Sequence, residues 1–372
     1  MTAGSLHGVH VTGWGAYAPS QVLTNADLEK MVETADEWIV SRTGICERRI
    51  AGPGETTASM AAVAGLRAIA TAGLDPDDID LILVGTLTPD YAMPSTAALV
   101  KEAIGNKRAA AMDLYAACSG FVYGYATANA YVASGMAKHV LVIGAETLSR
   151  YTDFSDRATC ILFGDAAGAA VLSASDEPGG TMGIEMTTDP TGAYLIWLPA
   201  GGAARPPTAA TLANGEHYMK MKGTETFKMA VRTLGSTAVA AVKRAGLQLS
   251  DIDLVVPHQA NVRIIEALAK SLDFPMEKVF VNVSHYGNTS AASVPLALTE
   301  AVAAGRVKQG DRVLFVAFGS GLTSGAITLE WTADPAAMSR ADAVGPDDVK
   351  IRQGYLESVN PFPPALEWLR NR

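Results

Sequence analysis

The chain has 372 residues, of which 49% are hydrophobic and 18% are charged, and its formal net charge is -9 at pH 7. This composition is typical of an α/β protein with a large core, and the negative charge argues against non-specific binding to nucleic acid or to an anionic membrane. The three cysteines, Cys46, Cys118 and Cys160, form neither a disulfide framework nor a metal cluster with suitable spacing. The N-terminus lacks a basic region followed by a long apolar run, so we expect a cytoplasmic protein without a membrane segment.

The first half of the chain contains elements that return in the second half. Residues 72–85 read as a helix end, a turn and a buried apolar strand, and residues 245–258 repeat that pattern closely. Two later pairs occur in the same order, namely residues 133–144 with 304–319 and the strands that begin at Phe163 and Phe318. The sequence therefore predicts a duplicated α/β unit.

The repeat suggests where the chain divides. We expect an N-terminal half over residues 1–180 and a C-terminal half over residues 181–331, connected at Asp176–Gly180. Residues 199–215, rich in Pro, Gly and Ala, read as an inserted loop. Residues 332–372 form an extension of unknown role, which could pack on the body, extend a dimer contact or cover an entrance.

Cys118 lies in Asp-Leu-Tyr-Ala-Ala-Cys-Ser-Gly-Phe, which reads as a strand leading into a helix that begins at the cysteine and runs to Ser134. A helix N-terminus stabilises a thiolate, so we expect the pKa of this thiol to be lowered. A single cysteine is more often a small buried hydrophobic residue. Two further segments favour the reactive interpretation.

These segments surround His258, in Val-Pro-His-Gln-Ala-Asn, and Asn288, in His-Tyr-Gly-Asn-Thr-Ser. A thiol, an imidazole and a carboxamide are the parts of a covalent acyl-transfer site, in which the thiolate takes the acyl group and the other two stabilise developing negative charge. The repeat predicts that Cys118 and Asn288 occupy equivalent places ahead of two helices, with His258 at a strand end. All three would then meet in one cleft between the halves.

The motifs around these residues resemble those of the β-ketoacyl-acyl carrier protein synthase III (ketosynthase III) family. The likeness runs from Val9 to Trp331 and includes five segments: Thr24–Leu28, Asp36–Arg49, Ala116–Gly120, Val256–Arg263 and Gly287–Pro295. It implies a thiolase-like five-layer αβαβα sandwich of two duplicated halves and a homodimer. No metal and no cofactor are implied, because acyl-CoA is a substrate.

The resemblance also implies a reaction. Cys118 would take an acyl group from acyl-CoA, and malonyl-acyl carrier protein would lose carbon dioxide and attack the bound thioester, giving a 3-oxoacyl-acyl carrier protein that initiates fatty acid or polyketide synthesis. His258 and Asn288 would donate hydrogen bonds to the malonyl thioester oxygen. The backbone N–H groups of Cys118 and Ser320 would form the oxyanion hole for the acyl carbonyl.

Further roles follow by resemblance at matching positions. The acyl pocket would include Met93 and Phe318. Five residues would contact coenzyme A: Trp38, Arg42, Arg157, Asn261 and Phe227.

Acyl carrier proteins are acidic, so their docking should need positive charge. We expect Arg263, Lys228 and Lys270 to supply it, although a solvated helix face explains Lys270 equally well. Met93 stands where many relatives carry Phe, which predicts acceptance of longer or branched starters. Ser324 stands where the family often has Trp, which leaves the shape of the pocket open.

Several alternatives compete with this interpretation. The acyl group could pass from Cys118 to another nucleophile, as in ketosynthase III-like acyltransferases or starter-loading enzymes of specialised metabolism. The order Cys, His, Asn also superficially fits a cysteine hydrolase. A phosphate cradle at Gly319–Gly325 lacks the Lys-Ser/Thr ending of a P-loop. A non-catalytic role or a metal site including His285 is less favoured.

Overall fold

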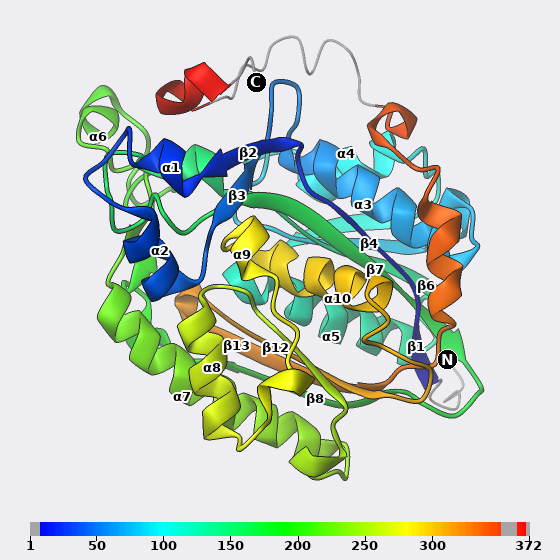
Figure 1. Cartoon of the computed structure of the whole chain (residues 1–372). Coiled ribbons are helices and arrows are strands. Elements are labelled where there is room, and N and C mark those ends of the chain that lie inside the picture. The colour runs from blue at the N-terminus through cyan, green and yellow to red at the C-terminus, as the bar shows by residue number, and fades with distance from the viewer. Residues whose placement is uncertain (1–7, 351–362, 370–372) are drawn as a thin grey trace.

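The computed structural model describes residues 8–350 and 363–369. Within this part of the chain, two larger β-sheets lie one above the other (Figure 1). The first sheet has the strand order β1 (Gly8–Tyr17), β7 (Asp165–Ser175), β6 (His139–Thr147), β4 (Leu81–Gly85) and β5 (Ala110–Leu114). The second has the order β11 (Leu254–Pro257), β12 (Arg312–Gly319), β13 (Thr323–Glu330) and β8 (Gly180–Thr188).

The two sheets share a pattern of strand direction. In the first sheet β4, β5 and β6 are parallel, and β7 runs antiparallel to both β6 and β1. In the second sheet β11 and β12 are parallel, whereas β13 runs antiparallel to both β12 and β8. Parallel strands buried on both faces require continuous apolar runs, and β4 is buried at every position.

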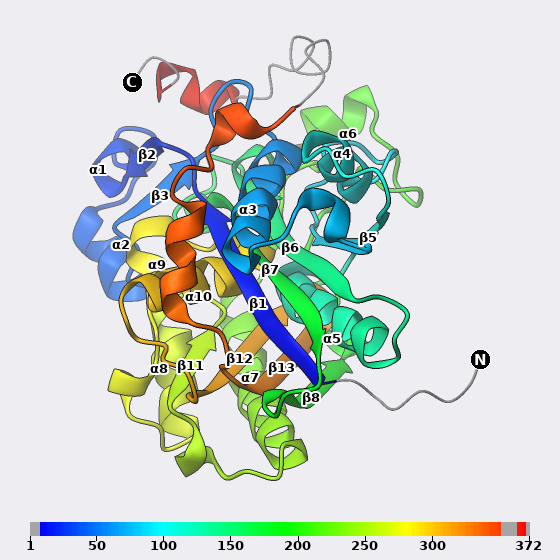
Figure 2. The ribbon, with the colours of Figure 1, turned by 90° about the vertical axis from the view of Figure 1, so that its right-hand side faces the viewer.

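Helices cover both sheets and fill the space between them (Figures 1 and 2). The outer face of the first sheet carries α3 (Thr57–Ala72) and α4 (Thr96–Ala103), and that of the second carries α7 (Gly223–Arg244) and α8 (Val262–Ser271). The central layer consists of α5 (Gly120–Ala133) and α10 (Ser293–Ala303), whose apolar side chains pack against both sheets. A helix that is apolar on all sides belongs in such a layer. The predicted five-layer sandwich is confirmed.

The repeat accounts for this symmetry, with one correction. Equivalent strands begin at Leu81 and Leu254, and the next pair begins at His139 and Arg312. On the same spacing Ala291 is the equivalent of Cys118. The predicted equivalence of Asn288 was wrong, because Asn288 lies in the loop before the equivalent turn. The division at residue 180 stays a prediction.

Each half presses its central turn against a strand of the other half. The turn Ser290–Ala292 lies on β6, where a β-carbon added to Gly144 would sit 2.1 Å from the Ala291 carbonyl oxygen. The turn Ala117–Ser119 lies on β12, where a β-carbon on Gly319 would sit 2.7 Å from the Cys118 amide nitrogen. Only glycine allows such close backbone approach.

Smaller elements surround the open edge of the sandwich. One group contains α1 (Asn25–Leu28), α2 (Asp36–Thr43) and the hairpin-like pair β2 (Gln21–Thr24) and β3 (Glu47–Ile50). Another contains α6 (Ala209–Ala213) and the short pair β9 (Ile196–Trp197) and β10 (Lys220–Met221), whereas α9 (Val283–Tyr286) packs against β3. The predicted loop over residues 199–215 therefore includes one short helix.

The C-terminal extension packs on the body wherever the structure describes it (Figure 2). Residues 335–350 run along α3, where Arg340 Nη1 donates to the Thr71 carbonyl (3.2 Å) and Arg67 Nε donates to the Val344 carbonyl (3.0 Å). Leu366 and Leu369 are fully buried in an apolar cluster with residues of β2 and α1. The sequence of the extension also suggests a short helix over residues 347–358, and most of that range lies outside the described residues. No helix of the described part is long and apolar enough to cross a membrane.

Candidate active site

A pocket of about 510 Å³ opens between the two halves and is lined by Cys118, His258 and Asn288. Cys118 comes from the turn before α5, His258 from the end of β11, and Asn288 from the loop between α9 and α10. The structure thus brings together the three residues that the sequence singled out.

Cys118 sits on a constrained turn at the start of α5. Ala117 has a φ of 47°, which is unusual for a residue other than glycine, and the Ser119 hydroxyl donates to the Thr323 carbonyl (3.3 Å). Thr323 in turn donates to the Ala116 carbonyl (2.9 Å). These bonds between the halves fix the sulfur at the floor of the pocket.

The electrostatics of Cys118 differ from the prediction. Loss of solvent raises the pKa of the thiol to about 12, a hydrogen bond with the Ser290 side chain opposes this shift, and the nearby charge of Glu146 adds to it. The expected lowering of the pKa is not found, because the loss of solvent around this partly exposed thiol is the largest effect and raises its pKa. The thiol needs a proton acceptor to become a nucleophile.

His258 is a buried, neutral imidazole. Its backbone N–H donates to the Val316 carbonyl (2.8 Å), and burial lowers the pKa of its side chain to about 4. Nδ1 lies 2.6 Å from the Ser293 hydroxyl oxygen, which also accepts the Gln259 backbone N–H (3.3 Å). In the tautomer in which the Ser293 hydroxyl donates to Nδ1, Nε2 carries the ring proton and is a hydrogen-bond donor.

The Asn288 side chain is also oriented as a hydrogen-bond donor. Its backbone N–H donates to the Leu162 carbonyl (2.8 Å), and its own carbonyl accepts from Gly164 (3.0 Å). The side-chain Oδ1 accepts the Ser290 backbone N–H (2.9 Å), which leaves the Nδ2 amide group as the donor. The pocket therefore carries two neutral hydrogen-bond donors.

Gly319 and Ser320 lie beside Cys118. Because Gly319 packs against the Cys118 amide nitrogen, the next residue along the chain is held close to the same amide. The Ser320 hydroxyl donates to the Ile196 carbonyl (2.5 Å), which ties this segment to β9. This arrangement suits an oxyanion hole built from backbone N–H groups, although that role of Cys118 and Ser320 stays a prediction.

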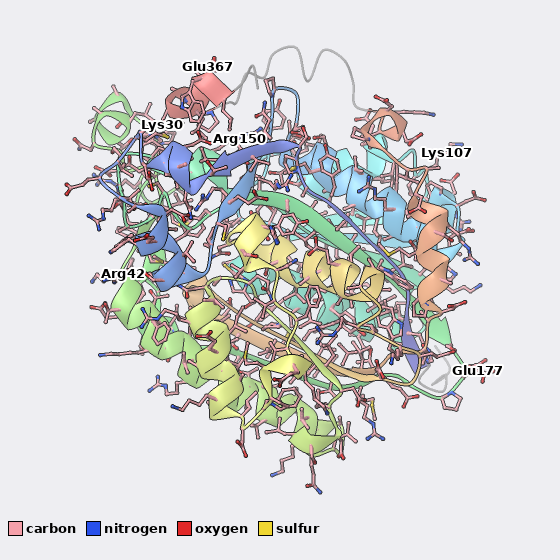
Figure 3. All side chains as sticks on the ribbon, viewed as in Figure 1. Lys30, Arg42, Lys107, Arg150, Glu177 and Glu367 are labelled. Carbon is pink, nitrogen blue, oxygen red and sulfur yellow. The ribbon has the colours of Figure 1, made fainter. Side chains whose placement is uncertain are left out.

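Trp38 on α2 lies between two guanidinium groups. The central carbon of Arg42 is 4.9 Å from the Trp38 ring centroid, and that of Arg157 is 4.3 Å away. Figure 3 labels Arg42 at the edge where α2 faces α8. Flat cationic and aromatic groups of this kind can stack on a purine ring.

Asn261 holds the mouth of the pocket together. Its Nδ2 donates to the Arg42 carbonyl (3.0 Å), and its Oδ1 accepts the Arg263 backbone N–H (2.9 Å) at the start of α8. The Arg263 guanidinium lies 6.0 Å from the Phe227 ring centroid. Arg42, Asn261, Phe227, Arg263 and Lys228 all line the pocket.

Some predicted site residues lie elsewhere. Met93 is 86% exposed and does not line this pocket within the described chain, whereas Phe318 does. Lys270 lies in the last turn of α8, away from the pocket lining. Ser324 is buried and bonded to the Thr237 hydroxyl and the Ala317 carbonyl, so it forms no wall of the pocket.

Sequence reasoning missed three residues behind the site. Ser290 and Ser293 stand inside the motif that includes Asn288, and Glu146 ends the apolar run of β6. A carboxylate at the end of a buried strand is an unusual feature, and it was the available signal. Ile196 of β9 and Met221 of β10, the two strands that flank the inserted loop, also line the pocket.

Comparisons with known proteins agree with this geometry. Residues 112–190 match the family 3-oxoacyl-[acyl-carrier-protein (ACP)] synthase III, and residues 242–331 match its C-terminal region. The β-ketoacyl-[acyl-carrier-protein] synthase III of Desulfitobacterium hafniense (strain DSM 10664 / DCB-2) is 50% identical over 324 residues, which cover 87% of this chain and 98% of the relative. That of Roseiflexus sp. (strain RS-1) is 51% identical over 323 residues, with coverage of 87% and 98%.

Solved structures agree as well. The 3-oxoacyl-[acyl-carrier-protein] synthase III from Aquifex aeolicus VF5 has a TM-score of 0.81 and 47% identity, covering 87% of this chain and 100% of that one. The priming β-ketosynthase from the R1128 polyketide biosynthetic pathway has a TM-score of 0.83 and 35% identity, covering 90% and 99%. The predicted resemblance is confirmed, and the chain belongs to the β-ketoacyl-acyl carrier protein synthase III family of ketosynthases.

Proposed function

We propose that this chain catalyses the decarboxylative condensation of an acyl-CoA starter with malonyl-acyl carrier protein, the reaction that initiates fatty acid synthesis. The observation that carries the proposal is one pocket holding a thiol, Cys118, together with two neutral donors, His258 and Asn288. Its relatives named as β-ketoacyl-acyl carrier protein synthases III support it.

The first half of the reaction uses Cys118. The sulfur attacks the starter thioester, a new thioester forms on the enzyme, and coenzyme A leaves with a proton. Negative charge on the acyl oxygen during this step would be held by the backbone N–H groups of Cys118 and Ser320.

The second half uses the two donors. Loss of carbon dioxide from the malonyl group leaves an enolate, whose oxygen would accept hydrogen bonds from His258 Nε2–H and Asn288 Nδ2–H. The low pKa of His258 keeps it neutral near pH 7, so it donates a hydrogen bond without giving up a full proton. The enolate carbon then attacks the acyl carbonyl on Cys118, which frees the thiol.

The substrates would reach Cys118 through the mouth of the pocket. The adenine of coenzyme A would stack between Trp38 and Arg157, and these groups would have to move apart to admit it, because the Arg157 guanidinium carbon lies 4.3 Å from the Trp38 ring centroid. Arg42, Asn261 and Phe227 would contact the rest of the cofactor arm. Arg263 and Lys228 at the mouth, with Lys270 further along α8, would receive the acidic carrier protein.

We propose a cytoplasmic homodimer. The strand β5 forms an edge of the first sheet, and the neighbouring side chains of Met93 and Tyr115 are 86% and 75% exposed. A second copy paired at this edge would cover those apolar groups, and Met93 would then reach the partner's acyl pocket. A flexible Met at that place predicts that longer or branched starters are accepted.

Mass spectrometry of the intact protein and its peptides tests the proposal. Incubation with a series of acyl-CoA thioesters should give an adduct on Cys118, which disappears with malonyl-acyl carrier protein as a β-ketoacyl product forms. An adduct that persists would contradict the condensation, and a strict preference for acetyl-CoA would contradict the proposed starter range.

A further inference from the structure

Glu146 is a buried carboxylate that the condensation chemistry does not use. It is the second-last residue of β6 and is fully buried, and four of its hydrogen-bond donors come from Thr86, Leu87 and Thr88. The shortest is from the Thr88 hydroxyl to Oε2 (2.6 Å). All these donors are neutral, so the structure holds an uncompensated charge or a proton at this place.

The other oxygen of Glu146 faces the active site through Ser290. The Ser290 hydroxyl donates to Glu146 Oε1 (3.0 Å), and the same side chain acts on the pKa of the Cys118 thiol across the contact between the turns Ser290–Ala292 and Ala117–Ser119. Ser290 has a φ of 50°, a strained conformation for a residue other than glycine. A hydroxyl has one proton, so while it donates to the carboxylate it presents a lone pair to the thiol.

The contacts from Cys118 through Ser290 to Glu146 give the partly exposed thiol a route for losing its proton. Ionising Cys118 into solvent would leave a thiolate close to the Glu146 carboxylate, and the two negative charges would repel each other. Moving the proton from sulfur to Glu146 leaves one negative charge throughout. His258 is a weak proton acceptor near pH 7, because burial lowers its pKa to about 4.

We propose that Glu146 accepts the Cys118 proton through Ser290 as the sulfur attacks the thioester. The S–H bond breaks and its proton passes to the Ser290 oxygen, while the Ser290 hydroxyl proton passes to Glu146. The electron pair stays on sulfur and forms the new carbon–sulfur bond, and Ser290 ends with one proton as it began. The inference rests on the proposed function only for the identity of the nucleophile.

The titration of Glu146 supports this geometry. Burial raises its pKa to about 7, in the range that suits a proton acceptor at neutral pH. The titratable groups that interact with it are Cys118, Tyr115 and Tyr151, and the pKa values of all three are raised. These groups stay protonated near pH 7, so Glu146 is the member of the set that changes charge there.

Alkylation of Cys118 by iodoacetamide, followed by peptide mass spectrometry between pH 5 and pH 10, tests the relay without any thioester. The wild-type rate should rise through about pH 7, because the carboxylate form is the acceptor and is lost as pH falls. Glu146→Gln and Ser290→Ala should each lower the rate at pH 8 by about 10²-fold, and the double variant no further. Glu146→Asp, which keeps an acceptor, should recover part of the rate and the inflection.

The sign of the Glu146→Gln effect separates the relay from simple electrostatics. Removing a nearby negative charge would by itself lower the thiol pKa and speed alkylation, so an equal or faster rate overturns the proposal. Exposed Cys46 in the same protein serves as an internal control, and buried Cys160 should stay unmodified unless a variant unfolds. Failure of the ketosynthase function would appear separately, as wild-type protein that alkylates normally but forms no acyl adduct.

Discussion

The two central turns of the molecule have the same backbone and different chemistry. Ala117 and Ser290 begin equivalent turns before α5 and α10, and their φ values are 47° and 50°. The next residue is the nucleophile Cys118 in one turn and inert Ala291 in the other. The duplicated halves have thus divided the work, since one presents the thiol and the other presents the donors His258 and Asn288.

The strongest way to test this division is to remove the thiol alone. In Cys118→Ala we expect condensation to fall by about 10³-fold or more, because Cys118 supplies the only thiol among the described residues that line the pocket. Decarboxylation of malonyl-acyl carrier protein should continue, since both donors belong to the other half. Product formation and carbon dioxide release are measured in parallel, and loss of both together would contradict the division.

Removing one of the two hydrogen-bond donors should slow decarboxylation and leave the acylation of Cys118 unchanged. His258→Ala and Asn288→Ala should each slow decarboxylation by about 10²–10³-fold, the usual effect of losing one oxyanion donor. The acyl adduct on Cys118 should still form at a near wild-type rate, as followed by intact-protein mass spectrometry. A large drop in the acylation rate would place these residues in the first half-reaction instead.

A single added methyl group can test how tightly the two halves pack against each other. Gly144→Ala would bring a β-carbon to 2.1 Å from the Ala291 carbonyl oxygen, so we expect the free energy of unfolding to fall by about 1–3 kcal/mol. At exposed Gly202 a β-carbon would meet no atom within 4 Å, and Gly202→Ala is the matched control, with a change within about 0.5 kcal/mol. Urea unfolding compares the two, and equal stabilities would contradict the tight contact.

The orientation of His258 gives the smallest expected effect. Ser293→Ala removes the hydroxyl that fixes the Nδ1 side of the ring, and decarboxylation should fall about tenfold, as for the loss of one hydrogen bond. Ser293→Thr keeps a hydroxyl and should recover part of the rate. If the two variants are equally slow, crowding in the buried site and not the hydrogen bond is responsible.

The sequence predicted the fold well because its signals are local and repeated. Apolar strands such as Leu81–Gly85 and the helix after Cys118 follow from periodicity, and the repeat and the motifs together indicate two layered halves. The same repeat led to an error at Asn288, because a likeness between segments does not fix which residues of a loop correspond. Equivalence became clear only from the matching turns.

The supporting contacts of the site could not be predicted in this way. Glu146 and Ser290 are far apart in the sequence, and nothing local in either segment indicates their hydrogen bond. The pKa of Cys118 depends on burial by side chains from both halves, whereas the sequence offered only its place at a helix start. Chemistry that arises from long-range packing stays hidden until the fold is known.

The reciprocal contact of each turn with the other half's strand has an evolutionary consequence. The turn Ser290–Ala292 packs on β6, and the turn Ala117–Ser119 packs on the equivalent strand β12, which is the pattern of an isologous two-fold interface. A single ancestral copy could have supported its turn only by pairing with a second copy. Within one polypeptide, the two halves thus contact each other as the subunits of a symmetric dimer do, although their contacting turns carry different chemistry.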